Sequence, residues 1–122
     1  MSWDEEAERV RAAYPRVTVV EQPVGTRWVE IGDLELPSGW DPPRSRIAIE
    51  VPSDFPQTKP NGFFVEPGLT APPGFPTPPP SGEERQGKNW AHVCYQHQTW
   101  VPERENLWRY IKAMLRWFAE AT

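Results

Sequence analysis

The feature that most constrains the fold is an apolar stripe near the end of the chain. Six large side chains recur there at the spacing i, i+3, i+4, i+7, i+8 and i+11: Leu107, Tyr110, Ile111, Met114, Leu115 and Phe118. This spacing gives a helix one broad apolar face, which must be buried against another layer. A proline and an acid at residues 102–103 predict that the helix begins there and runs to about residue 121. Trp108 and Trp117 flank the stripe and are expected to extend the contact.

The layer beneath this helix is predicted to be a small sheet. Four segments rich in β-branched or aromatic residues follow one another with short turns, at residues 16–21, 26–36, 45–51 and 61–66. In the third, Ile47, Ile49 and Val51 share one face. Because no helix lies between the segments, we expect a four-stranded antiparallel meander. With a short acidic helix at residues 2–14, the fold class is α+β, in a single domain over residues 1–122.

Residues 67–88 break this pattern. They are rich in proline and glycine, have no apolar period, and are expected to form a long irregular loop. Three interpretations remain open: a loop that covers a site, a tolerated surface insertion and, for residues 76–80, a proline-rich ligand for an aromatic groove. The charged triplet at residues 83–85 is expected to be a solvated loop tip.

Composition excludes several classes of function. The formal net charge is −4 and no basic stripe is present, which argues against nucleic-acid binding, because that needs clustered lysine and arginine. A single cysteine excludes an internal disulfide and a cluster of thiolates around a metal. No apolar run approaches the roughly 20 residues that span a bilayer, and the acidic start does not match a signal peptide. We therefore expect a cytoplasmic protein with no membrane partner.

Three local patterns follow one another in a recognisable order. Residues 49–56 read Ile-Glu-Val-Pro-Ser-Asp-Phe-Pro and are followed by Pro60. Val93–Cys94 then precede Trp100-Val101-Pro102, and the predicted closing helix comes next. Ubiquitin-conjugating enzymes have a strand that ends in hydrophobic-Pro-x-x-Tyr-Pro-x-x-x-Pro, and an Ile-Cys pair ahead of a Trp-Ser/Thr-Pro element. Over residues 3–118 the chain resembles this family, and it is similar to compact bacterial ubiquitin-conjugating-like proteins.

The resemblance implies a fold and a chemistry. Cys94 would accept a ubiquitin-like modifier from an activating enzyme as a thioester and pass it to an amine. ATP would be consumed by the activating enzyme, so this protein is expected to need no cofactor. An ordinary free thiol is a few per cent thiolate at neutral pH, so strong activation is not obligatory. Without the resemblance, a lone cysteine would be interpreted as a buried structural residue.

The chain departs from the family ahead of the cysteine, where the His-Pro-Asn tripeptide is absent. Asn89, five residues before Cys94, is the candidate to replace its oxyanion donor. His92 and His97 are the only histidines, and this residue type suits proton transfer near neutral pH. On an extended strand His92 shares a face with Cys94, whereas His97 does so only if the chain turns. Each can equally be an ordinary loop-capping or solvated residue. We expect no metal site, because no fourth ligand accompanies these histidines and the thiol.

Two tryptophans bracket the cysteine segment. Trp90 and Trp100, with Pro102, are expected to wall a groove for the modifier's tail, although core packing explains the tryptophans equally well. The leading function is a conjugating enzyme, and the alternative is a non-catalytic module of the same fold that binds a ubiquitin-like protein or peptide. The missing tripeptide favours the module, and Cys94 ahead of Trp-Val-Pro favours the enzyme. A Cys-His protease and a regulatory or toxin-associated interaction domain are weaker alternatives.

Overall fold

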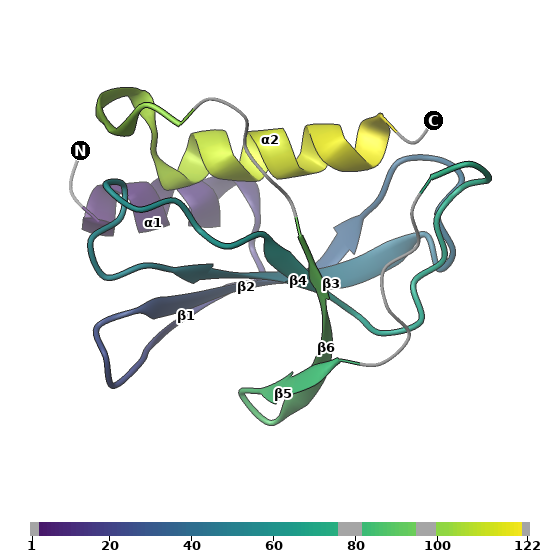
Figure 1. The fold of residues 1–122 in the computed structure, drawn as a ribbon, viewed down its shortest axis with the longest axis horizontal. Helices are drawn as coiled ribbons and strands as arrows, with labels where there is room; N and C mark the ends of the chain where they lie inside the picture. The colour runs from purple at the N-terminus through teal and green to yellow at the C-terminus, as the bar shows by residue number, and fades with distance from the viewer. Residues whose placement is uncertain (1–2, 76–81, 95–99, 121–122) are drawn as a thin grey trace.

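A six-stranded antiparallel sheet with two helices on one side forms the described part of the protein (Figure 1). This computed structural model describes residues 3–75, 82–94 and 100–120. The elements in chain order are α1 (Trp3–Ala13), β1 (Val17–Glu21), β2 (Arg27–Glu35), β3 (Arg44–Val51), β4 (Phe63–Val65), β5 (Glu83–Arg85), β6 (Lys88–Val93), the 3₁₀ helix η1 (Pro102–Arg104) and α2 (Leu107–Ala119). The strands lie in the order β1-β2-β3-β4-β6-β5.

The α+β class and the meander of the first four strands are confirmed. β1 to β4 pair in sequence order, and Ile47 of β3 lies between Ile31 of β2 and Val65 of β4. The predicted alternation on β3 is also confirmed. Ile47, Ile49 and Val51 are buried in the main core, whereas Ala48 belongs to a separate cluster on the opposite face.

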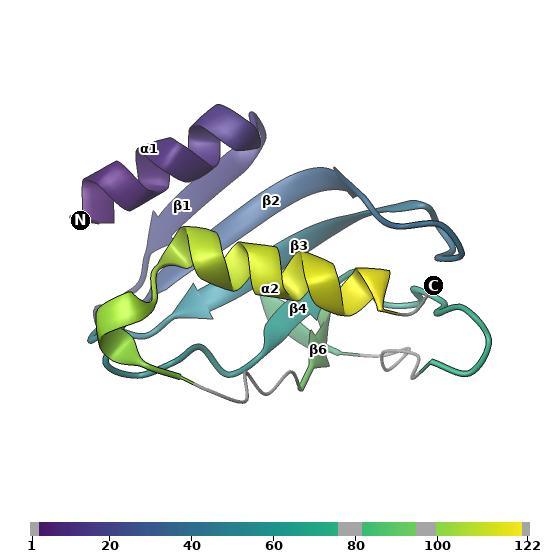
Figure 2. The ribbon, with the colours of Figure 1, turned by 90° about the horizontal axis from the view of Figure 1, so that it is seen from above.

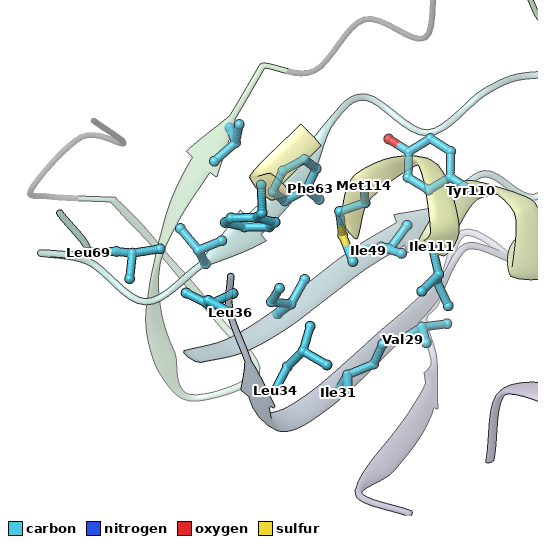
Figure 3. Close-up of a cluster of buried hydrophobic side chains, with 14 of the residues drawn as sticks. Val29, Ile31, Leu34, Leu36, Ile49, Phe63, Leu69, Tyr110, Ile111 and Met114 are labelled. Carbon is cyan, nitrogen blue, oxygen red and sulfur yellow. The ribbon is translucent and has the colours of Figure 1, made fainter. Parts of the chain in front are cut away.

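The main core fills the space between the sheet and α2, which crosses the sheet with α1 beside it (Figure 2). The predicted stripe supplies it from above, with Tyr110, Ile111 and Met114 facing the sheet (Figure 3). Trp117 extends the contact as predicted, because its ring lies 5.4 Å from that of Phe63. Tyr110 also donates its hydroxyl proton to the carbonyl of Gly62 at 2.8 Å, so this buried polar group is satisfied.

The closing helix begins later than predicted. Residues 102–104 form η1, and α2 starts at Leu107, because the side chain of Asn106 accepts a hydrogen bond from the Arg109 amide at 2.9 Å. A second cap comes from the other helix. The nearly buried carboxylate of Glu6 in α1 accepts the Leu107 amide at 2.7 Å. A negative charge at this end complements the helix dipole, so Glu6 ties α1 to the start of α2.

The prediction for residues 67–88 was wrong at its C-terminal end. There β5 and β6 form a hairpin, and β6 adds to the edge of β4. Gln86 and Gly87, with φ of 53° and 74°, make its two-residue turn. Charged residues fill both sides of this turn, which removes the apolar alternation that marks most strands. Residues 76–81, which include the predicted proline-rich ligand, lie outside the described residues.

The hairpin covers the outer face of the sheet, opposite the helices (Figure 1). A second cluster lies there and consists of Trp28, Ala48, Phe64 and Trp90. Arg85 of β5 stacks over the Trp28 ring and pairs with Glu50 at 2.7 Å. Lys88 of β6 pairs with Glu30 of β2 at 2.6 Å. The hairpin is therefore held to the sheet by one small apolar cluster and several ion pairs.

Candidate active site around Cys94

Cys94 directly follows β6, and its side chain is exposed. The end of the strand is fixed, because Val93 pairs with Phe63 of β4 and is nearly buried. The interpretation of a buried structural cysteine is therefore wrong. The sulfur is exposed at the end of a strand that is held in the sheet.

His92 lies beside this sulfur, on the face predicted from the period of two. Its Nδ1 is 3.9 Å from Cys94 Sγ. The imidazole rests on the Phe64 ring, with 4.8 Å between the ring centroids. Hydrogen bonds of catalytic pairs are commonly long in unliganded enzymes and tighten in the reacting complex. The geometry therefore makes His92 and Cys94 a candidate dyad.

The second ring nitrogen of His92 fixes the position of the proton. His92 Nε2 is hydrogen-bonded to the backbone carbonyl of Asn61, in the segment before β4. A carbonyl oxygen only accepts, so Nε2 must carry a hydrogen and donate it. In the neutral imidazole Nδ1 then has the free lone pair, and this lone pair faces the thiol. His92 is thus arranged as a proton acceptor for Cys94.

A depression of about 350 Å³ opens beside His92 on the outer face. Most of the residues that line it are of polar or charged type: Thr26, Glu50, Pro52, Thr58, Lys59, Asn61, Phe64, Glu83, Arg85 and His92. Burial lowers the pKa of Arg85, but its ion pairs with Glu50 and Glu83 outweigh burial and raise that pKa. Arg85 therefore stays charged and holds β5 beside the depression.

The structure does not bring Asn89 to Cys94. Asn89 lies five residues earlier on the extended β6, a separation of roughly 16 Å along the strand. It is exposed and sits next to the hairpin turn, where its backbone carbonyl accepts a hydrogen bond from Arg46. A strand keeps these two positions apart, whereas the predicted loop would have allowed contact. His97 lies outside the described residues.

None of the predicted groove residues lines this depression. Trp90 is fully buried in the outer cluster and donates its indole N–H to the Arg85 carbonyl at 3.0 Å. Trp100 donates to the Pro56 carbonyl at 2.8 Å, and its ring lies 5.9 Å from that of Phe55. Two of the recognised sequence patterns are therefore in contact. Pro102 is the first residue of η1.

Sequence reasoning missed the residues that complete the site. Asn61 acts through its backbone carbonyl, which every residue type carries, so no sequence signal marks it. Lys59 lies two residues earlier and lines the same depression. The loop before β4 lies near His92 because β6 pairs with β4, and the sequence does not mark this pairing. Among the described residues, no group of three or more His, Cys, Asp or Glu side chains is placed to hold a metal ion.

The arrangement of a meander sheet, an exposed cysteine and a packed helix after it is that of an E2-like, ubiquitin-conjugating-like protein. The family model described as Prokaryotic E2 family E matches residues 10–121, and the chain belongs to this family. Membership implies E2-like conjugation in general, with a ubiquitin-like modifier and an activating enzyme as partners. No curated protein and no solved structure matches the chain.

In the three described ranges, neither α1 nor α2 is long and apolar enough to cross a bilayer.

Proposed function

We propose that Cys94 accepts a ubiquitin-like modifier as a thioester and passes it to an amine nucleophile. The exposed sulfur, 3.9 Å from an imidazole nitrogen whose lone pair faces it, is the observation that carries this proposal. Membership of an E2 family supplies the reaction class. We place the reaction in the cytoplasm, where the activating enzyme has ATP.

The first step is an exchange of thioesters. His92 Nδ1 takes the proton of the Cys94 thiol, and the thiolate attacks the carbonyl carbon of the modifier's thioester on the activating enzyme. A tetrahedral oxyanion forms and collapses, so that the new C–S bond to Cys94 remains and the bond to the activating enzyme's sulfur breaks. The leaving thiolate takes the proton from His92 Nδ1, which makes the imidazole neutral again. The Nδ1–H that His92 has gained can donate to the oxyanion while it exists.

The second step is aminolysis. An amine that has lost its ammonium proton to His92 Nδ1 attacks the thioester carbonyl, and the C–S bond breaks as the C–N bond forms. The Cys94 thiolate leaves and takes up the second amine proton, so the products are an amide and the free thiol. His92 thus takes the role of the tripeptide asparagine of ubiquitin-conjugating enzymes, as a base that becomes a donor after the proton transfer.

The test is a loading reaction with an activating enzyme, a ubiquitin-like protein that this enzyme activates, and ATP. We expect an adduct that a thiol reductant removes. Cys94→Ser should give a reductant-resistant oxyester, and Cys94→Ala should give no adduct. Because the chain has one cysteine, Cys94→Ala removes every thiol and is a complete control.

His92→Gln should slow loading, because it removes the base that faces the thiol. His97→Gln is the matched control, because it removes the other histidine near Cys94 in sequence, and it should slow loading less than His92→Gln does. Wild-type protein that gives no adduct with a partner pair known to be active would contradict the proposal. That result would favour the non-catalytic binding module.

A further inference from the structure

We infer that Lys59 is a modification site of this protein, and that its amine receives the acyl group from Cys94 in the same molecule. The inference rests on the proposed function, because it needs a thioester on Cys94. It adds an acceptor to that function, and it makes the conjugating protein one of its own substrates.

Only three lysines compete for the acyl group, at positions 59, 88 and 112. Lys88 lies at the far end of β6, roughly 20 Å along the strand from Cys94, and its ammonium pairs with Glu30 at 2.6 Å. Lys112 is on α2, on the other side of the sheet, with its ammonium 4.7 Å from the centre of the Trp108 ring. Lys88 is therefore on the face of the thiol but too far along the strand, and Lys112 is on the opposite face.

Lys59 lies on the side of the thiol. It lines the depression that His92 and Asn61 also line. It is two residues from Asn61, so their α-carbons are within about 7 Å, and the Asn61 carbonyl holds the imidazole that faces the sulfur. The chain therefore carries the lysine, the base and the thiol on one edge of the sheet.

The loop that carries Lys59 is anchored on both sides. Thr58 donates its hydroxyl proton to Asp54 at 2.8 Å, and the Pro56 carbonyl accepts the Trp100 indole at 2.8 Å. After Lys59, Pro60 is buried. A fixed loop keeps the Lys59 side chain beside the depression that His92 also lines.

The chemistry is the aminolysis described above, within one chain. The Lys59 ammonium gives one proton to His92 Nδ1, and the amine attacks the thioester carbonyl on Cys94. The C–N bond forms, the C–S bond breaks, and the Cys94 thiolate leaves with the second amine proton. No oxidant, metal or further reactant is needed.

The experiment uses a small acyl donor, so that it does not depend on finding the modifier. The full chain is incubated with the thioester of N-acetylglycine and mercaptoethanesulfonate, and the acylated residues are mapped by peptide mass spectrometry with and without reductant. The variants are Lys59→Arg, Lys88→Arg, Lys112→Arg and Cys94→Ala.

We expect a reductant-sensitive acyl group to form first on Cys94 and a reductant-resistant one to follow on Lys59. The rate of the second step should not depend on protein concentration. Lys59→Arg should lower the reductant-resistant product at least tenfold and keep the thioester. Lys88→Arg and Lys112→Arg should behave as wild type, and Cys94→Ala should acylate Lys59 no faster than the other lysines.

Three results would overturn the inference. They are a thioester that never yields an amide, an amide on Lys88, Lys112 or the N-terminal amine instead, and an amide on Lys59 that survives Cys94→Ala. The loading reaction with activating enzyme and modifier separates the two proposals. If that reaction gives a thioester while Lys59 stays unmodified, the proposed function stands and only the self-modification fails.

Discussion

The two faces of the sheet are built in different ways. The inner face packs on α2 in one continuous core, and most of its side chains are fully buried. The outer face buries only the cluster Trp28, Ala48, Phe64 and Trp90, and relies on ion pairs such as Arg85–Glu50 to hold the hairpin. The inner face supplies most of the folding free energy, and the outer face positions His92 and Cys94.

Two adjacent residues of β4, Phe63 and Phe64, belong to opposite faces of the sheet. Phe63 points to the inner core and contacts the Phe118 ring at 5.5 Å. Phe64 points outward and contacts Trp28 at 5.0 Å and His92 at 4.8 Å. Truncating either one should therefore separate stability from chemistry.

The largest effect on stability is expected from Phe63→Ala. It removes a fully buried ring from the main core, so we expect a loss of about 4–5 kcal/mol in the free energy of unfolding. Urea unfolding measured by tryptophan fluorescence checks this value. A loss below about 2 kcal/mol would mean that the inner core does not dominate the stability.

Phe64→Ala is expected to lower the free energy of unfolding by less, about 3 kcal/mol. The outer cluster is small, so neighbouring side chains can partly fill the cavity that the ring leaves. The substitution should also slow the alkylation of Cys94 by iodoacetamide, because the His92 imidazole loses the ring on which it rests. Phe63→Ala, assayed under conditions where it stays folded, is the control and should leave alkylation nearly unchanged. An equal decrease in the rate of Cys94 alkylation in both variants would contradict the different roles of the two faces.

Glu6→Ala tests the cap between the two helices on the inner side. It leaves the Leu107 amide without its carboxylate partner, and we expect a loss of about 2 kcal/mol. Glu6→Gln keeps an acceptor and removes the charge, so its cost should be about 1 kcal/mol. Neither change should alter Cys94 alkylation. Equal and negligible costs for both would show that this cap contributes nothing to stability.

The smallest effect is expected from Lys88→Gln. It removes the ion pair with Glu30, and with about half of the Lys88 side chain exposed we expect a loss of about 0.5 kcal/mol. Repeating the unfolding at about 1 M salt should abolish the difference, because salt screens exposed pairs. A loss above about 2 kcal/mol would mean that charge holds the outer face more strongly than the aromatic cluster does.

The inner face could be predicted from the sequence because apolar periodicity specifies it. The stripe from Leu107 to Phe118 and the alternation of Ile47, Ile49 and Val51 both follow from spacing alone. The shared face of His92 and Cys94 followed from the same rule, because a strand has a period of two.

The outer face could not be predicted in the same way. Arg85 and Lys88 find partners 35 and 58 residues away, and such pairs leave no local pattern. The amide of Asn89 made it a candidate oxyanion donor, but the extended strand β6 keeps this side chain away from the thiol. Asn61 contributes a carbonyl, which carries no residue signature. The site thus depends on a hairpin with charged and polar residues beside its turn, where the apolar pattern does not predict the strands.

The most direct test of the account is the rate of Cys94 alkylation by iodoacetamide at neutral pH, in wild type and in His92→Gln. If Nδ1 accepts the thiol proton, wild type should react roughly ten to a hundred times faster. Superimposable rates at neutral pH, with both proteins folded, would contradict the proposed dyad.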